Sequence, residues 1–452
     1  MKKTKVLVPS GVLGLGFDLT AFKNGLKLSP DIISIDGGST DSGPFSLGTG
    51  TSKYSRNSIK SEWKTLMEAR QKLKIPLVIG SCGTCGTNNM VDWMEEITLE
   101  ISKELNHKVK IAKLYCEIPN SKLLKNYKNG LLADLEPKVK INEKLIKNIT
   151  HTVALAGSEQ IQAAINTKAD IILAGRTTDT AIIAALPLLN GSQPGISWHG
   201  AKIAECGALC STEPTSGVVM IEFNNKDFII FPLSKKAKCT PETVSAHMLY
   251  ENADPFVLYE PGGYMNVKNA TYTAINKKKV KVEGAEWIKE KNYYVKLEGA
   301  RISGYQTSSL ILLRDERYVK NAEKWSSKLK SFLIEEIQKR MNLKNKDYDL
   351  QFRHIGKNAT LGDLELKACT PTEIGILCIV TSKKMEISVE ISKLINPFLL
   401  HYPLTKNEEL PTFAFPFSPV HAERGALYEF SLNHKLKLKD PMSIFKIELK
   451  DS

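Results

Sequence analysis

The first half of the chain alternates short apolar runs with longer segments of helical character. The short runs end at polar loops, a pattern typical of buried strands. They cover residues 5–8, 31–35, 75–80, 109–115 and 169–174. The helical segments cover residues 57–73, 89–106 and 181–189. This alternation predicts an α/β fold in which a Rossmann-like, mostly parallel sheet carries helices on both faces.

The pattern changes near Glu213. Residues 218–223 and 228–233 predict a β-hairpin, and two long helices separate the short strands that follow. We expect an α/β ligand-binding domain over residues 1–213 and an α+β C-terminal domain over residues 214–452. Polar segments of the second half to which the pattern assigns no role are 250–255, 260–263 and 297–301.

Composition describes a globular protein of more than one domain. The chain has 452 residues, of which 42% are hydrophobic and 25% charged. The formal net charge of +13 raises the question of nucleic acid, but 53 of the 62 basic residues are lysines. Specific nucleic-acid readers favour arginine for bidentate contacts, and no zinc-finger spacing or basic repeat occurs. We therefore expect no nucleic-acid partner.

The eight cysteines are too few for a disulfide framework in a chain of this length, and they suit a reducing compartment. Lysines near the N-terminus resemble a signal peptide, but Pro9 and three glycines interrupt the apolar stretch that follows. No apolar run is long enough to span a bilayer. These features predict a cytoplasmic protein without a membrane partner.

Three of the predicted strands lead into loops that carry most of the candidate chemistry. The loops cover residues 36–44, 80–88 and 175–180 and are rich in glycine, hydroxyl groups and carboxylates. In open α/β sheets, ligands bind beyond the carboxyl ends of the strands. We therefore expect these loops to meet at one cleft. A glycine-rich turn at 10–16 has the reverse order of the dinucleotide fingerprint, so a dinucleotide site is not favoured.

The candidate site residues come from these loops and from the segment 198–210. Groups suited to acid–base catalysis are Asp36, Asp41, Asp179, His199 and Glu205. Groups suited to substrate binding are Ser39, Thr40, Ser81, Thr84, Arg176, Thr177, Thr178 and Lys202. The aspartates are also able to hold a divalent cation through oxygen. The alternative is that Thr177, Thr178 and Asp179 cap a helix and that His199, Lys202 and Glu205 form an ordinary polar helix edge.

Cysteine spacing leaves a metal or redox site open. Cys82 and Cys85 form a C-x-x-C pair, and zinc or an iron–sulfur cluster would require a second pair, for which Cys206 and Cys210 are the candidates. We favour a loop in which the cysteines fill space like other small residues, and we assign no residue to a metal.

Six motifs together resemble the AtuA-like family of acyclic terpene utilisation proteins. They are DGGSTDSGP at 36–44, GSCGTCG at 80–86, GRTTDTA at 175–181, AKIAECG at 201–207, ENADPF at 251–256 and FAFPFSP at 413–419. The resemblance implies a role in the breakdown of branched carboxylic acids through CoA thioesters. It carries no agreed set of catalytic residues.

We therefore expect an enzyme that acts on a small carboxylic acid or acyl-CoA thioester by hydration, dehydration or carbon–carbon lysis. Each of these reactions passes through enolate-like charge, which loop N–H groups and Arg176 are placed to stabilise. The alternative is a non-catalytic acyl-binding subunit of a multi-protein catabolic complex. The sequence leaves the cofactor open, with a divalent cation or the CoA thioester substrate as the candidates. The expected partners are a small-molecule carboxylate or acyl-CoA, and the chain is expected to form a homo-oligomer or to bind a small partner subunit.

Overall fold

The computed structural model describes residues 3–367 and 371–452. The chain forms two compact units, residues 1–301 with 430–452 and residues 302–429. The boundary expected at 214 falls inside the first unit, because the hairpin of β8 (Val219–Phe223) and β9 (Asp227–Pro232) joins the main sheet through β1. The division of the chain into two units therefore depends on pairing between strands that are far apart in the sequence.

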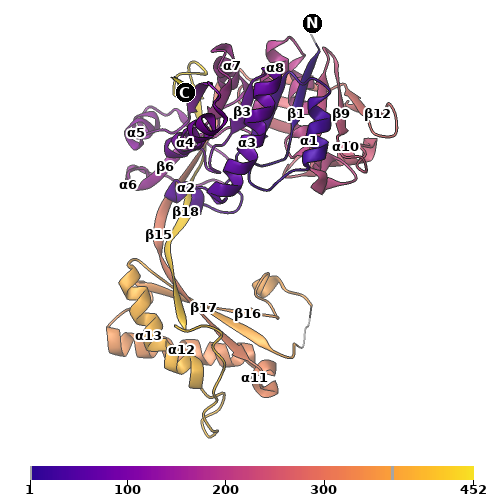
Figure 1. Ribbon diagram of the computed structural model, residues 1–452. Helices are drawn as coiled ribbons and strands as arrows, with labels where there is room; N and C mark the ends of the chain where they lie inside the picture. The colour runs from indigo at the N-terminus through magenta and orange to yellow at the C-terminus, as the bar shows by residue number, and fades with distance from the viewer. Residues whose placement is uncertain (1–2, 368–370) are drawn as a thin grey trace. The chain divides into compact units, whose positions relative to one another are not determined.

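The first unit is built on a ten-stranded sheet in the described residues (Figure 1). Its centre is parallel and runs in the order β1 (Thr4–Val8), β2 (Ile32–Asp36), β3 (Leu77–Gly80), β7 (Ile171–Ala174) and β4 (Lys110–Tyr115). Antiparallel strands extend one edge through β8, β9, β13 (Val280–Glu283) and β12 (Thr271–Ala274), and β19 (Lys446–Asp451) extends the other. The predicted α/β character is confirmed, but parallel pairing is confined to the centre of the sheet.

Helices cover both faces of this sheet because side chains of each strand alternate between them. On one face, Ile33 and Ile35 pack with the buried sides of the helices α1 (Leu19–Leu26), α3 (Arg56–Leu73) and α4 (Asn88–Leu105). On the other face, Ile32 and Val78 pack with α7 (Ser158–Asn166), α8 (Ala181–Leu189) and α9 (Pro194–Ala204). The two cores hold the carboxyl ends of the parallel strands in fixed positions.

The rest of the first unit consists of shorter elements beside the main sheet. Three strands form a separate antiparallel sheet: β10 (Val257–Glu260), β11 (Gly263–Asn266) and β14 (Glu286–Lys289). Further strands are β5 (Leu132–Asp134) and β6 (Ile149–Ala154), which pair with β18 (His421–Leu438) and β15 (Tyr293–Leu313), respectively. Short helices are α2 (Phe45–Thr49), α5 (Asn120–Lys128), α6 (Glu143–Lys147) and α10 (Pro241–Ala246). The start of β15 and the end of β10 bring glutamates to the site described below.

The second unit combines antiparallel strands with helices. The latter part of β15 pairs with β17 (Ile374–Ser382), which also pairs with β16 (Tyr348–Ile355). The helices are α11 (Glu316–Lys320), α12 (Ala322–Met341) and α13 (Met385–His401). Phe413 packs edge-on against Tyr318 and Trp325, so the start of the motif at 413–419 belongs to the core of this unit.

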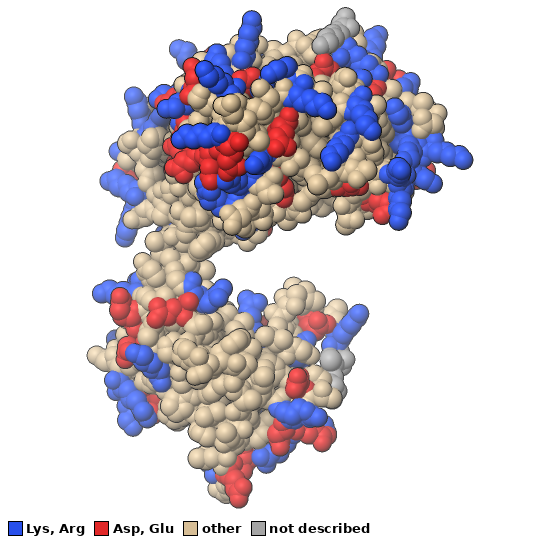
Figure 2. All heavy atoms as spheres, in the orientation of Figure 1, with Lys and Arg blue, Asp and Glu red and all other residues tan. Residues whose placement is uncertain are grey.

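The distribution of charged side chains over the surface and the hydropathy of the helices agree with what the sequence indicated. Figure 2 shows basic side chains spread over the visible face of the first unit, with acidic side chains among them. Within the described residues, none of the helices has the length and apolar character needed to cross a bilayer.

Candidate functional site

Backbone hydrogen bonds join the three predicted loops at the carboxyl edge of the parallel strands. Gly37 N donates to Gly80 O at 2.8 Å, Ser81 N donates to Gly175 O at 2.9 Å, and Thr84 N donates to Gly37 O at 3.1 Å. These bonds continue the register of β2, β3 and β7 beyond the strand ends. The predicted convergence of the loops is confirmed.

Small residues allow the loops to approach this closely. A Cβ atom on Gly86 would lie 2.1 Å from the backbone nitrogen of Arg176, and one on Gly37 would lie 2.6 Å from Ser81 O. Ser81 and Thr84 adopt positive φ values of 45° and 78°, which are uncommon for residues other than glycine. The loop between β3 and α4 is therefore shaped by backbone contacts, and Ser81 and Thr84 are fully buried within it.

Arg176 pairs with a glutamate that the sequence analysis did not select. Its Nε and Nη2 donate to Glu298 Oε2 and Oε1 at 3.1 and 3.3 Å, and its Nη1 donates to Ser81 Oγ at 3.0 Å. Thr40 Oγ1 adds a hydrogen bond to Glu298 at 3.1 Å. Burial disfavours the charged form of Glu298, but Arg176 holds the pKa of this carboxyl below its usual value. Arg176, Ser81 and Thr40 are thus joined to Glu298 and to one another by hydrogen bonds within the protein.

Next to these loops lies a cavity of about 200 Å³, here called the acid cavity. Four of the predicted residues line it: Asp36, Ser39, Asp41 and Asp179. Other polar lining residues are Lys53, Tyr54, Cys206, Tyr250 and Glu251. Tyr250 and Glu251 belong to the polar segment 250–255, to which the sequence analysis assigned no function. The cavity therefore joins both halves of the sequence.

Asp36 is the carboxyl group best placed for proton transfer in this cavity. It is 4% exposed, and its Oδ2 accepts a hydrogen bond from Gly38 N at 3.1 Å, while Oδ1 has no partner among the described residues. Burial and the neighbouring charge of Asp179 raise the pKa of Asp36 well above its usual value, against the opposing effect of Arg176. Burial also raises the pKa of Asp179. The two carboxylates repel each other, so one of them tends to keep a proton. Asp36, whose pKa is raised well above its usual value, is the one that keeps it more readily.

A second group of charges lies beneath the acid cavity. Lys202 Nζ pairs with Glu205 Oε1 at 2.5 Å, and both side chains are buried. Burial raises the pKa of Glu205 to about 8, although Lys202 opposes the shift. Burial likewise raises the pKa of Glu260 to about 7; its Oε1 accepts a hydrogen bond from Thr180, and its Oε2 has no partner among the described residues. These carboxyls are able to exchange protons near neutral pH.

His199 lies away from this site. Its ring packs edge-on against Phe228 and Tyr272, and the Tyr272 hydroxyl lies 3.1 Å from Nε2. Burial lowers the pKa of His199 to about 3. The spacing of six residues between His199 and Glu205 rotates the helix by about 240°, so the two side chains point in different directions. The structure therefore does not bring His199 to the acid cavity.

The remaining predicted residues lie in different places, and none of them lines the acid cavity. Thr177 is fully buried, and its Oγ1 has no hydrogen-bond partner among the described residues. Thr178 reaches a second cavity, described next. Cys82 and Cys85 are buried, and no grouping of three or more possible ligands in the described part of the chain contains either of them. The paired-cysteine site is not found there.

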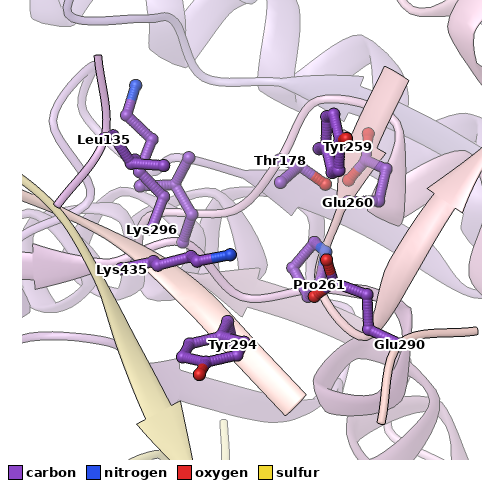
Figure 3. Close-up of a pocket in the computed structure, with 10 residues that line it drawn as sticks. Leu135, Thr178, Tyr259, Glu260, Pro261, Glu290, Tyr294, Lys296 and Lys435 are labelled. Atoms are coloured by element: carbon purple, nitrogen blue, oxygen red, sulfur yellow. The ribbon is translucent and has the colours of Figure 1, made fainter. Parts of the chain in front are cut away.

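The second cavity, here called the apolar pocket, has a volume of about 400 Å³ (Figure 3). Its lining consists of Leu135, Leu155, Thr178, Tyr259, Glu260, Pro261, Glu290, Tyr294, Lys296 and Lys435. Thr178, Tyr259 and Glu260 lie on one side, and Lys435 extends its ammonium group from the other (Figure 3). Pockets of this size suit a small molecule. The negative charge of Glu260, which lines this pocket, contributes to the raised pKa of Glu205.

Possible metal ligands gather at one place in the described residues. Glu205, Cys206 and His247 each place a ligand atom within 4.8 Å of the others. The three aspartates proposed from sequence as cation ligands, Asp36, Asp41 and Asp179, do not form such a group within the described ranges. The sequence analysis missed His247, which lies far along the chain and in no polar motif.

Comparison with known proteins identifies the family. Residues 49–190 and 216–407 match the family described as acyclic terpene utilisation family protein AtuA. No match is found among curated proteins or among solved structures. The matched ranges cover well over half of the chain and include the loop at 80–88 and the loop at 175–180, whose Asp179 lines the acid cavity. The chain therefore belongs to the AtuA family of acyclic terpene utilisation proteins, as its motifs indicated.

Proposed function

We propose that this protein is a cytoplasmic catabolic enzyme that acts on a small branched carboxylic acid or its CoA thioester. Family membership places the protein in acyclic terpene utilisation, and the proposed reaction is hydration, dehydration or carbon–carbon lysis. The observation that carries the proposal is Asp36, a buried carboxyl that lines a small polar cavity and whose Oδ1 has no hydrogen-bond partner among the described residues. Such a group is suited to deliver or remove a proton at a substrate carbon or hydroxyl.

The neighbours of Asp36 support this role. Asp179 repels negative charge on Asp36 and so favours the protonated, acidic form. Lys53 lines the same cavity and supplies a positive charge that a carboxylate or an enolate-like intermediate requires. Arg176 acts as a positioning residue. It lies on the loop that carries Asp179, and its bond to Glu298, which also accepts from Thr40, connects this loop to the one that carries Asp36.

The apolar pocket supports an acyl substrate. Its leucines, proline and tyrosines suit a branched hydrocarbon chain, and Lys296 and Lys435 suit an anionic group at one end. Glu260 lines this pocket, and its pKa near 7 allows it to exchange a proton under physiological conditions. We propose that the acyl part of the substrate enters here while the reacting carbon lies toward the carboxyl groups.

A hydrogen–deuterium exchange experiment tests the proposal. The purified protein is incubated in D₂O with a branched 3-hydroxyacyl-CoA or the corresponding enoyl-CoA, and mass spectrometry follows deuterium at the α-carbon and interconversion of the two. We expect both in the wild type, and a loss of roughly 10²- to 10⁴-fold in Asp36→Asn. Glu100→Gln, in a surface ion pair with Arg56 and Lys60, is the control. Saturable binding without exchange or turnover would instead support the non-catalytic acyl-binding subunit and overturn the enzyme.

A further inference from the structure

Glu205, Cys206 and His247, from two parts of the chain, form a cluster at the edge of the acid cavity, which Cys206 lines. Glu205 and Cys206 follow the last turn of α9, and His247 lies where α10 passes into the short 3₁₀ helix His247–Leu249. A carboxylate oxygen, the Cys206 Sγ and an imidazole nitrogen all lie within 4.8 Å of one another. At this separation, small side-chain rotations would bring all three atoms to one ion with metal–ligand bonds of about 2.0–2.3 Å.

His247 provides an independent sign of a ligand. The side chain is 4% exposed, and its Nε2 has no hydrogen-bond partner among the described residues. The imidazole does form a hydrogen bond with the backbone of Lys202, so this bond uses Nδ1. A histidine that binds metal commonly donates its other N–H to a backbone carbonyl, which leaves the lone pair of Nε2 free for the ion. A buried nitrogen without any partner is otherwise costly.

Cys206 connects the cluster to solvent. It is partly exposed and lines the acid cavity together with Asp36 and Asp179. An ion held by three protein ligands has a fourth position, and here that position would face the cavity. Zinc sites with catalytic roles have this form, with three protein ligands and one open position.

The ligand types favour zinc over magnesium or calcium. Thiolate and imidazole are preferred by zinc, whereas magnesium and calcium require oxygen ligands. Lys202 pairs with Glu205 through Oε1, which leaves the second carboxylate oxygen for the ion.

We propose that Glu205, Cys206 and His247 bind a zinc ion whose open coordination position faces the acid cavity. The inference is independent of the reaction proposed above, because it concerns metal binding alone. It adds a Lewis acid to the edge of a cavity that the sequence motifs identified only through their carboxylates.

Metal analysis with cobalt substitution tests the site. Protein purified under reducing conditions without chelator is assayed for zinc, then stripped, loaded with Co²⁺ and examined by absorption spectroscopy. We expect about one zinc ion per chain and a thiolate-to-cobalt charge-transfer band. Cys206→Ser should abolish the band and His247→Gln should weaken cobalt binding at least tenfold. The matched controls Cys210→Ser and His199→Gln alter buried residues outside the cluster and should keep both signals.

Two results would overturn the proposal. One is a wild-type protein that binds neither zinc nor cobalt in stoichiometric amount while its melting temperature shows that it is folded. The other is a charge-transfer band that survives in Cys206→Ser, since the thiolate ligand would then be another cysteine. Because the readout is metal content and absorption, failure here would leave the deuterium-exchange result unaffected.

Discussion

The guanidinium of Arg176 lies against the carboxylate of Glu298 with both groups about 6% exposed and joined by two hydrogen bonds. Arg176 follows β7, and Glu298 lies on β15, which pairs with β6. The pair therefore connects the carboxyl edge of the parallel strands to a strand that sequence patterns assigned to a different domain.

Breaking this pair should destabilise the first unit. Arg176→Met removes the buried partner of Glu298 and leaves the more exposed Lys296 at 3.6 Å. Loss of a buried partner typically costs about 3–5 kcal/mol. Glu298→Gln should have an effect in the same direction. Chemical denaturation followed by tryptophan fluorescence measures the free energy of unfolding. The double variant Arg176→Met/Glu298→Leu is the control and should recover part of the loss, because the carboxylate of Glu298 is removed together with its partner, while Asp179 still loses the guanidinium 3.7 Å away. Equal losses in the single and double variants would contradict this account.

Asp36→Asn should separate activity from stability. Asparagine resembles the protonated carboxyl in shape, so the fold should persist while turnover falls roughly 10²- to 10⁴-fold. The raised pKa means that the folded state keeps a proton that the unfolded state releases above its ordinary value of 3.8. The free energy of unfolding of the wild type therefore falls as pH rises from 3.8 toward the raised pKa of the folded state. Asp36→Asn lacks this ionisable group and should not show that fall. Thermal melts from pH 4 to pH 8 would reveal the difference in slope; parallel slopes would contradict the assignment.

His199 should control stability at acidic pH. Its pKa of about 3 means that the folded state stays neutral while the unfolded chain takes up a proton below the ordinary value of 6.5. Stability is therefore lost as pH falls from 6.5 toward 3, by up to about 1.4 kcal/mol per pH unit. Between pH 7 and pH 5, His199→Gln should lose about 2 kcal/mol less than the wild type. Tyr272→Phe removes the hydrogen-bond partner of His199 but keeps the ring buried. Its free energy of unfolding, measured by urea denaturation at each pH, should therefore depend on pH as that of the wild type does.

Gly86 tests the close approach of the loops. Gly86→Ala places a Cβ atom 2.1 Å from the nitrogen of Arg176 at a φ of 63°, so we expect a loss of about 1–3 kcal/mol together with reduced turnover. Gly16→Ala is a matched control, since Gly16 also has positive φ (85°) but has open space around it. A difference between the two variants in denaturant midpoint isolates the steric effect from the backbone strain; no difference would show that the loops tolerate separation.

Local patterns were enough to locate the elements and the loops. The helices expected at 57–73, 89–106 and 181–189 occur at Arg56–Leu73, Asn88–Leu105 and Ala181–Leu189. Hydrophobic periodicity determines these spans because each helix packs one face on the sheet. The loops after β2, β3 and β7 were expected to meet because parallel strands bring their carboxyl ends to one edge.

Partners distant in sequence could not be foreseen in the same way. Arg176 looked free for an anion because its partner, Glu298, lies 122 residues away in a polar segment with no periodic signal. His199 and Glu205 share a helix end, but only the packing of Phe228 and Tyr272 shows that the histidine faces another core. The strand pairing beyond residue 214 could not be foreseen for a related reason, since β8 pairs with β1 across about two hundred residues of chain.

The first unit is discontinuous, and this has a consequence for synthesis on the ribosome. Strand β19 completes the edge of the main sheet by pairing with β4, from Lys446 opposite Tyr115 to Asp451 opposite Lys110. All of residues 302–429 leave the exit tunnel before this strand does. The nascent chain must therefore hold β4 as an open edge while the inserted unit is translated and folds, a period in which chaperones that cover exposed strand edges would have their greatest effect on yield.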